Sequence, residues 1–298
     1  MNIFLTGGNG QVGYELKRSL AIFGTVDSPD RTLLNLENSN EVIAYLDAKK
    51  PDLIVNAAAW TAVDKAEEEK EKAEALNKNL PKILADYAAK EGIWLVHYSS
   101  DYVYPGIGID PWTEEDVTGP LSVYGESKLQ GDMSIISSSC LHLIFRTSWV
   151  YSTRGKNFMK TMLKLAQTRE LLTVVNDQYG APTTARLIAD ITALAVNRIC
   201  QAADLDSGIY HLASSETTNW YEFANSIFTI ARANSVDLSI KEVIGIPTSA
   251  YPTPAKRPLN SRLAVDKIEN AFGITMPDWH SQLVLTMEDY LCKKEGWV

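Results

Sequence analysis

Short apolar runs alternate with helical stretches through the first two thirds of the chain. Several of these runs are apolar almost without interruption, as in the strands of a parallel sheet that helices cover on both faces. Strand–helix alternation of this kind predicts an α/β fold built on a doubly wound parallel sheet. We expect strands at residues 2–7, 52–59, 94–100, 142–150, 172–175 and 208–213, and helices at 11–23, 40–49, 80–91 and 121–137.

The pattern changes after about Trp149. Helical segments at 155–167 and 220–233 are followed by a proline-rich stretch at 246–258, and a last helical segment covers 279–291. We interpret residues 151–298 as a smaller, mostly C-terminal region that lies over the open end of the sheet. The strand-like run at 208–213 indicates that part of residues 171–213 returns to the first region, residues 1–150.

Charge and cysteine content narrow the range of partners. The formal net charge of −9 argues against nucleic acid or a membrane surface as a partner. Cys140, Cys200 and Cys292 are too far apart for a close-spaced metal or disulfide pattern. The N-terminus does not resemble a signal peptide, and no run is long enough for a membrane span. We therefore expect a cytoplasmic protein that acts on a small molecule.

A glycine-rich turn follows the first expected strand. The stretch FLTGGNGQVG, residues 4–13, places Gly7, Gly10 and Gly13 three apart before a helix. Glycine allows positive φ and close approach of the backbone to a ligand, and free amides at a helix N-terminus can face a pyrophosphate. The turn predicts a Rossmann-type dinucleotide-binding domain in residues 1–150. Its spacing resembles that of extended short-chain dehydrogenases/reductases.

Two charged residues lie where such a domain meets the adenosine ribose. An acid such as Asp30 would bind a free 2′-hydroxyl, as in NADH, and a base such as Arg31 would accept the 2′-phosphate of NADPH. Because both residue types are present, the sequence leaves NADPH or NADH open. Either residue is also compatible with an ordinary surface loop.

Three Tyr-x-x-x-Lys pairs occur, namely Tyr45–Lys49, Tyr124–Lys128 and Tyr290–Lys294. Only Tyr124–Lys128 follows a strand with a polar end, which carries Ser100 and Asp101. Ligands of open α/β sheets bind beyond the carboxyl ends of the strands, and residues i and i+4 share one helix face. We therefore assign a catalytic site to the pair Tyr124–Lys128.

The residue types fit the reduction of a carbonyl. Tyr124 would protonate the carbonyl oxygen while a nicotinamide delivers hydride to the carbon, and Ser100 would bind that oxygen. A free tyrosine has a pKa of about 10, and we expect the Lys128 cation to lower that of Tyr124. Lys128 would also hold the nicotinamide ribose.

Six stretches carry a more specific resemblance, which runs from residue 1 to about residue 280. They are NAAAWTAVDKAE, HYSSDYVYPG, PLSVYGESKLQGD, FRTSWVY, NDQYGAPT and PTSAYPTPAKRPLNSRL. Together they resemble the dTDP-4-dehydrorhamnose reductase family. The resemblance implies reduction of a 4-keto nucleotide sugar with NADH or NADPH to dTDP-L-rhamnose for bacterial surface polysaccharide, including the O-antigen of lipopolysaccharide.

The resemblance implies a set of contacts beyond the catalytic residues. The cofactor would be bound by Gly7, Gly10, Gln11, Val12, Asp30, Arg31, Asn35, Leu36, Ala59, Trp60 and Thr61. The sugar nucleotide would be bound by Ser100, Asp101 and Trp149, and residues 151–298 would be its binding region. Independently of the resemblance, Arg257 lies at the end of the proline-rich stretch, where its guanidinium could pair with a phosphate.

The chain departs from the family at a few positions. Ser100 stands where threonine is frequent, and Asn35 stands where aspartate is common. Some members dimerise through a metal held by acidic groups; Glu15 matches one such position, whereas Arg186 occupies another. Because a cation repels a metal, we expect a monomer or weak homodimer and no metal site. The strand residues His97, His142 and His211 are expected in the core.

Two alternatives remain open. Another nucleotide-sugar enzyme of this fold, a 4,6-dehydratase or 4-epimerase, is one, although the dehydratases carry an Asp-Glu pair where this chain has Asp101–Tyr102. The other is a non-catalytic regulatory subunit of methionine adenosyltransferase. A broken catalytic set would favour that subunit, whereas Ser100, Tyr124 and Lys128 are all present.

Overall fold

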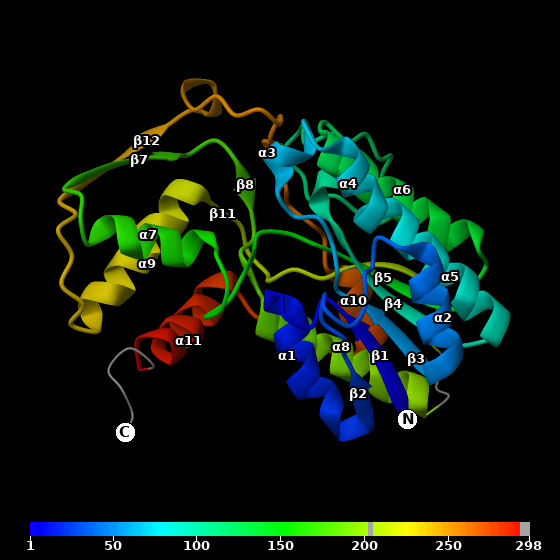
Figure 1. Ribbon diagram of the computed structural model, residues 1–298. Helices are drawn as coiled ribbons and strands as arrows, with labels where there is room; N and C mark the ends of the chain where they lie inside the picture. Colours follow the sequence, from blue (N-terminus) through cyan, green and yellow to red (C-terminus); the bar gives the residue numbers. More distant parts are fainter. Residues whose placement is uncertain (202–204, 293–298) are drawn as a thin grey trace.

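The computed structural model describes residues 1–201 and 205–292, and a six-stranded sheet lies at its centre (Figure 1). The strand order is β10-β5-β4-β3-β1-β2, and all neighbouring pairs are parallel. The order reverses between β1 and β3, which is where doubly wound sheets bind ligands. The strands are β1 Asn2–Thr6, β2 Thr25–Asp27, β3 Leu53–Asn56, β4 Trp94–Ser100, β5 His142–Thr147 and β10 Gly208–His211.

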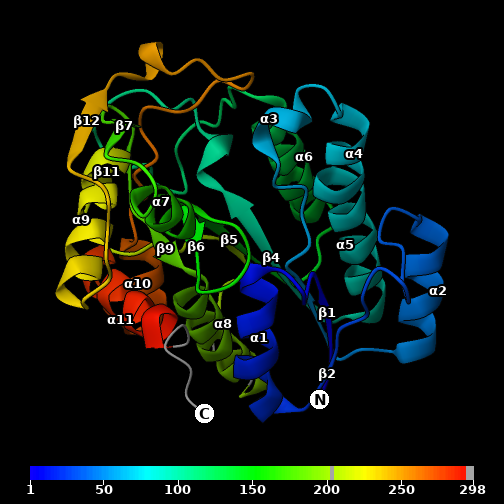
Figure 2. The same ribbon diagram turned by 60° about the vertical axis from the view of Figure 1, so that its left-hand side comes forward.

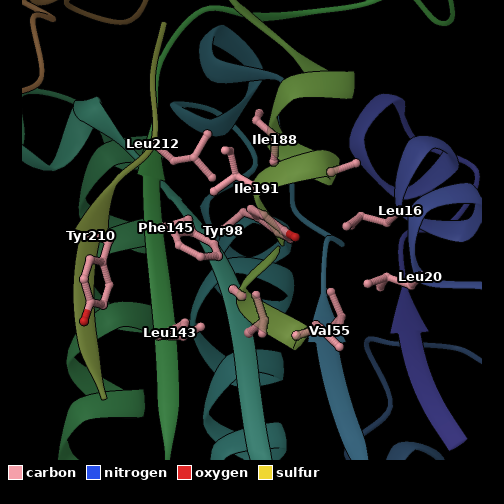
Figure 3. Packing of buried hydrophobic residues seen from close by; sticks show 14 of the residues in the cluster. Leu16, Leu20, Val55, Tyr98, Leu143, Phe145, Ile188, Ile191, Tyr210 and Leu212 are labelled. Carbon is pink, nitrogen blue, oxygen red and sulfur yellow. The ribbon is translucent and has the colours of Figure 1, made fainter. Parts of the chain in front are cut away.

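Helices cover both faces of this sheet (Figure 2). On one face, Leu16 and Ile188 from the helices share an apolar cluster with Val55 and Phe145 from the strands (Figure 3). All residues of β3 and β5 are buried, as expected for a covered parallel sheet. One face carries α1 Gln11–Leu20, α8 Ala185–Cys200 and α10 Asp266–Phe272; the other carries α2 Ser39–Lys49, α5 Leu80–Glu91 and α6 Val123–Ser137.

A second region has its own apolar core and lies beside the first in Figure 1. Its helices are α7 Phe158–Ala166, α9 Trp220–Ala233 and α11 Trp279–Cys292. Its strands form three two-stranded sheets within the described residues: β7 Leu171–Val175 with β12 Glu242–Ile246, β8 Tyr179–Gly180 with β11 Thr218–Asn219, and β6 Val150–Tyr151 with β9 Thr183–Thr184.

The chain crosses between the two regions several times. It leaves the first region after β5, returns through α8 and β10, and leaves again for α9 and β12. Residues 247–265, which we call the strap, then run from the second region past α3 Val63–Ala66 to α10 (Figure 1). Between α3 and α5 lie α4 Lys70–Glu74 and a π-helical turn, Ala75–Asn79.

A side-chain cap positions the start of α6. The hydroxyl of Ser122 accepts a hydrogen bond of 3.2 Å from the backbone amide of Gly125. The amide of Val123 donates to Glu67 Oε1 at 2.9 Å. These bonds satisfy amides that have no partner within the helix. They therefore fix the first turn of α6, which carries Tyr124.

The doubly wound parallel sheet is confirmed, with some differences. The run expected as one strand at 142–150 is divided between β5 and β6, because Trp149 between them has a φ of +47°. Within residues 171–213, α8 and β10 join the first region, whereas β7 pairs with β12 in the second. The division into two domains at residue 150 stays a prediction. In the described part of the chain, no helix is long and apolar enough to span a membrane.

Candidate active site

The glycine turn between β1 and α1 has no room for side chains. Gly7 has a φ of +70°, and a Cβ there would lie 2.5 Å from the carbonyl oxygen of Ala57. A Cβ on Gly13 would be closer still to the backbone of Gly7. Gly10 precedes α1 and supplies no side-chain cap, so the first amides of the helix keep their donors free. The turn is a cradle that fits a pyrophosphate.

The two residues after Gly10 contact different regions: Gln11 contacts the second region, and Val12 packs on the core of the first. The side-chain oxygen of Gln11 accepts hydrogen bonds from Ser152 at 3.1 Å and from Asn157 at 2.8 Å. Val12 is partly buried against the core below α1. The Gln11 side chain therefore ties the start of α1 to the second region and leaves its backbone amide for the cradle.

The residues predicted to meet the adenosine lie beyond β2. One oxygen of Asp30 accepts hydrogen bonds from the Thr32 amide at 2.8 Å and the Thr32 hydroxyl at 2.6 Å. These bonds lower the pKa of Asp30 below its ordinary value, so the carboxylate stays ionised. Arg31 and Asn35 are exposed, and Leu36 packs partly against the core on the α2 side.

The turn after β3 carries Ala59, Trp60 and Thr61, and one buried asparagine holds it. Asn77 Oδ1 accepts from the Trp60 amide at 2.9 Å, and Asn77 Nδ2 donates to the Trp60 carbonyl at 3.1 Å and to Ser127 Oγ at 3.0 Å. Asn77 thus links this turn to α6. Asn77 could not be singled out from the sequence, because an asparagine within a charged helical run gives no signal of its role.

Ser100 and Tyr124 come together where β4 ends and α6 begins. The Ser100 hydroxyl donates to Asp101 Oδ1 at 3.0 Å, and it lies close enough to the Tyr124 phenol to affect its titration. Burial raises the pKa of Tyr124 more than the neighbouring Ser100 hydroxyl lowers it. Tyr124 is therefore protonated at neutral pH, as a proton donor must be.

Lys128 is buried on the same helix, and its amine points at β4. Its Nζ donates to the Tyr98 carbonyl at 2.6 Å and lies 3.3 Å from His97 Nε2. Burial lowers the pKa of Lys128 to about 8, while nearby Asp132 acts in the opposite direction. The expectation that Lys128 lowers the pKa of Tyr124 is wrong for this structure, because burial of the phenol dominates.

Asp101 is almost fully buried between β4 and the strap. Its Oδ1 accepts a hydrogen bond from Ser100 at 3.0 Å and Ser261 lies nearby, yet burial raises the pKa of Asp101 to about 6. Its second oxygen, Oδ2, meets no hydrogen-bond donor among the described residues. The sequence offered no reason to single out Ser261, which comes from a distant segment of the chain. A buried acceptor is thus available beside Ser100.

Trp149 belongs to an aromatic cluster at the boundary of the two regions. Its ring stacks on that of Trp220, with centroids 3.7 Å apart and planes 13° from parallel. Phe158 extends the cluster, with its ring 4.6 Å from that of Trp220. Gly180 lies against Trp149, since a Cβ there would be 2.9 Å from the indole. Positive φ is rare in so bulky a residue, and packing on both sides maintains it.

Arg257 ties the strap to the first region. One nitrogen lies 2.6 Å from Asp64 Oδ2 of α3, and another donates to the Tyr102 hydroxyl at 3.2 Å. The amide of Ala255 donates to the other oxygen of Asp64 at 3.3 Å. The residue predicted to bind a phosphate thus has a carboxylate partner in this structure.

The two other Tyr–Lys pairs lie elsewhere. The Tyr45 hydroxyl donates to Asp27 at 3.0 Å, and burial together with Asp27 raises its pKa to about 12. Lys49 lies 5.4 Å from the centre of the same ring. Tyr290 is on α11, and Lys294 falls outside the described residues. Both tyrosines are on helices other than the one that follows β4.

The position where some family members bind a metal holds a cation of the protein itself. Arg186 lies 2.6 Å from Asp289 and 3.7 Å from Glu15, so its guanidinium occupies the place between the carboxylates. A divalent cation does not fit beside that charge. Within residues 1–201 and 205–292, no three His, Cys, Asp or Glu side chains gather as metal ligands. The three strand histidines are buried in β4, β5 and β10, namely His97, His142 and His211.

Known proteins resemble this chain along nearly its whole length. A family model described as the RmlD substrate binding domain matches residues 1–292. The dTDP-4-dehydrorhamnose reductase of Escherichia coli K12 is 48% identical over 283 residues, with 94% of each chain covered.

Two crystal structures of dTDP-4-dehydrorhamnose reductases have the same fold. The one from Clostridium acetobutylicum is 33% identical and superposes with a TM-score of 0.89, covering 98% of this chain and 100% of that one. The one from Bacillus anthracis, solved in complex with NADP, is 30% identical with a TM-score of 0.86, covering 97% and 99%.

Proposed function

Because the chain belongs to the family of dTDP-4-dehydrorhamnose reductases, we propose that it reduces the 4-keto group of dTDP-4-dehydrorhamnose to give dTDP-L-rhamnose. The reductant is NADPH or NADH. The observation that carries the proposal is the placement of Ser100, at the end of β4, beside Tyr124 in the first turn of α6. The product supplies rhamnose for bacterial surface polysaccharide such as the O-antigen of lipopolysaccharide.

The glycine cradle is the proposed cofactor site. The absence of room for a Cβ at Gly7 and the uncapped amides from Gln11 onward support binding of a pyrophosphate. The bound dinucleotide supplies a hydride to C4 of the sugar. Asp30 would bind a ribose hydroxyl and Arg31 a 2′-phosphate, which favours use of both nicotinamides. The remaining proposed cofactor contacts are Val12, Asn35, Leu36, Ala59, Trp60 and Thr61.

Tyr124 is the proposed general acid. Its proton passes to O4 of the sugar, and the Ser100 hydroxyl holds that oxygen in place. Burial keeps Tyr124 protonated until the oxygen gains negative charge. Lys128 would bind the nicotinamide ribose and restore the proton of Tyr124. A positioned proton donor accelerates such a step by roughly 10² to 10⁴.

The sugar nucleotide would bind between the end of β4 and the strap. The unpartnered oxygen of Asp101 is suited to a sugar hydroxyl, and the partly exposed ring of Trp149 to an apolar ring face. Arg257 would bind a phosphate through parallel hydrogen bonds, in competition with Asp64. This arrangement supports a substrate that extends from the first region to the second.

One assay tests the proposal. Oxidation of NADPH and NADH is measured by absorbance with and without dTDP-4-dehydrorhamnose, and the sugar product is identified by NMR. We expect oxidation that requires the keto sugar and yields dTDP-L-rhamnose. Absence of oxidation with both nicotinamides would contradict the proposal.

The same assay separates the alternatives. A 4-epimerase or a dehydratase of this fold consumes no nicotinamide over a turnover, and Asp101–Tyr102 lacks the second carboxylate of a dehydratase. A regulatory subunit of methionine adenosyltransferase would oxidise no nicotinamide in the presence of the keto sugar. The intact set of Ser100, Tyr124 and Lys128 favours the reductase.

We also propose a monomer or weak homodimer that assembles without a metal and acts in the cytoplasm, where nicotinamides and nucleotide sugars are made. The pairing of Arg186 with Asp289 and Glu15 supports this assembly state. Size-exclusion chromatography with light scattering, in magnesium and in EDTA, should give one and the same mass. A dimer that dissociates in EDTA would contradict it.

A further inference from the structure

A buried histidine with no part in the proposed mechanism contacts Lys128. His97 in β4 is fully buried, and its Nε2 lies 3.3 Å from Lys128 Nζ. Its other ring nitrogen, Nδ1, lies 2.9 Å from Asn56 Nδ2. Burial, together with the charge of Lys128, holds the pKa of His97 well below its ordinary value. The ring is therefore neutral and carries a single N–H proton.

A chain of hydrogen bonds determines which nitrogen carries that proton. The chain begins at the amide of Ala58, which can only donate and does so to Thr6 Oγ1 at 3.1 Å. The Thr6 hydroxyl donates onward to Asn56 Oδ1 at 2.6 Å, a distance typical of O–H···O bonds. The amide NH₂ of Asn56 then faces His97 Nδ1, which must accept. The ring proton is left on Nε2, facing Lys128.

An N–H group facing Lys128 favours the amine over the ammonium form. An ammonium has three donors and no lone pair, so it gains nothing from a second donor. A neutral amine accepts from His97 Nε2–H and still donates to the Tyr98 carbonyl at 2.6 Å. Burial acts in the same direction and lowers the pKa of Lys128 to about 8.

The charged group that opposes this effect is already paired. Asp132 lies one turn after Lys128 on α6 and raises its pKa. Its Oδ2 accepts from Arg146 Nε of β5 at 3.2 Å and from Ser99 Oγ of β4 at 2.9 Å. The negative charge of Asp132 is thus largely compensated by Arg146, whereas the His97 ring contacts the amine directly at 3.3 Å.

We propose that His97 is a positioning residue for the reduction, whose Nε2–H, oriented by Asn56 and Thr6, stabilises the amine form of Lys128 enough that the amine and the ammonium interconvert near the working pH. The proposal rests on the function proposed above for Tyr124 and Lys128. After the O–H bond of Tyr124 breaks in favour of the sugar oxygen, the Lys128 ammonium gives one proton to the tyrosinate. The amine left behind then takes a proton from solvent. Such exchange is efficient when the pKa of Lys128 lies near the working pH.

The tautomer of His97 can be read directly by ¹⁵N NMR of protein labelled at histidine. The His97 signals are assigned as those missing from His97→Gln. At pH 7 we expect a neutral ring with its hydrogen on Nε2. A hydrogen on Nδ1, or an imidazolium at pH 7, would overturn the proposal. This measurement needs no substrate, so its result is independent of whether the protein reduces a sugar nucleotide.

The pH dependence of kcat tests the effect on Lys128. Because the ammonium is the proton source, kcat falls as the pH rises through the pKa of Lys128. His97→Leu removes the N–H, so this decline should move up by about one pH unit. His97→Gln keeps an N–H near the same place and should retain the wild-type profile.

A second buried histidine provides the control. The His142 ring, on the neighbouring strand β5, contacts the Cys140 carbonyl at 2.8 Å, and His142→Leu should leave the pH profile unchanged. A folded His97→Leu enzyme with the wild-type profile, or an equal shift in His142→Leu, refutes the role of His97. If His97→Leu does not fold, the NMR measurement on wild type still decides.

Discussion

The two regions hold their candidate site residues in different ways. In the first region, Ser100, Tyr124 and Lys128 lie at the end of one strand and on one capped helix, both packed on a continuous buried sheet. Trp149 and Arg257 lie instead on a two-residue junction and on a proline-rich strap. Side chains on regular elements keep their mutual geometry better than those on loops. The residues proposed for the bond chemistry are therefore held more rigidly than those proposed for substrate recognition.

The contacts of these candidate residues also differ in their degree of burial between the first region and the strap. Lys128 and Asp101 are buried, and each has a hydrogen-bond partner within the protein. The ion pair of Arg257 with Asp64 is partly exposed, with 20% and 41% of the two side chains accessible. Exposed ion pairs contribute about 0 to 1 kcal/mol. A substrate phosphate can therefore replace Asp64 at little cost in stability.

The largest effect should come from the first region. Tyr124→Phe removes the proposed proton donor and should lower kcat roughly 10²- to 10⁴-fold. Affinity for dTDP-rhamnose, measured by calorimetry, should change little. Tyr45→Phe, from a pair of the same spacing, should be nearly wild type in steady-state kinetics. A folded Tyr124→Phe enzyme with full activity would show that Tyr124 is not the proton donor, and the proposed difference between the two regions would no longer hold.

The next effect concerns Asp101, where strand and strap meet. Its pKa is about 6 in the folded state and 3.8 as the ordinary value, so the native state binds the extra proton between pH 4 and 6. Its contribution to the free energy of unfolding is therefore greatest at low pH. It should decline by on the order of 2–3 kcal/mol as the pH rises through this window.

Asp101→Asn has no carboxyl group to titrate at this position. The difference in stability between wild type and variant therefore reports the titration of Asp101 alone. Urea unfolding of both proteins at pH 4, 5, 6 and 7 should show the variant gaining stability relative to wild type as the pH rises. A difference that stays constant over this range would show that the carboxyl titrates normally.

Substitutions in the second region and the strap should act on binding alone. Arg257→Ala should raise KM for the dTDP-sugar roughly 10- to 100-fold, the usual range for a lost charge-assisted hydrogen bond. Trp149→Ala should act in the same direction, and kcat and the Kd for NADPH should stay near wild type in both. Lys256→Ala, an exposed neighbouring cation, is the control. A fall in kcat at unchanged KM in either variant would show that the substituted residue acts in the chemical step and not in substrate binding.

The smallest effect is expected from Arg31 in the first region, and it concerns the choice between NADPH and NADH. Arg31 is exposed, so its pairing with a 2′-phosphate is weakened by solvent. Arg31→Ala should raise KM for NADPH by up to about fivefold and leave NADH almost unchanged. Kinetics with both nicotinamides test this, with Lys50→Ala as an exposed control. Equal changes for both nicotinamides would show that Arg31 does not contact the phosphate.

The first region could be predicted from sequence to a large extent, for local reasons. Continuous apolar runs indicate covered parallel strands, and Gly7 and Gly10 mark the cradle between neighbouring elements. Tyr124 could be selected from three similar pairs because a polar strand end precedes it. Each of these inferences uses contacts between residues close in the chain or within one strand–helix unit.

The second region could be predicted less well, because its contacts join distant segments. The stacking of Trp220 on Trp149 and the approach of Ser261 to Asp101 depend on tertiary packing that no local pattern reveals. The pKa of Tyr124 is another example. The cation of Lys128, four residues after Tyr124, suggested a lowered pKa. Burial of the phenol, which depends on the whole fold, raises the pKa instead.

The repeated crossing of the chain between the regions has a consequence for synthesis. The first 150 residues lack α8, β10 and α10, so β5 would have an unpaired edge and α1 an uncovered apolar flank. Exposed strand edges and apolar surfaces of this kind promote aggregation. Since α10 ends at Phe272, the ribosome must release nearly the whole polypeptide before this core closes. We therefore expect the nascent chain to depend on chaperones until its last helices emerge.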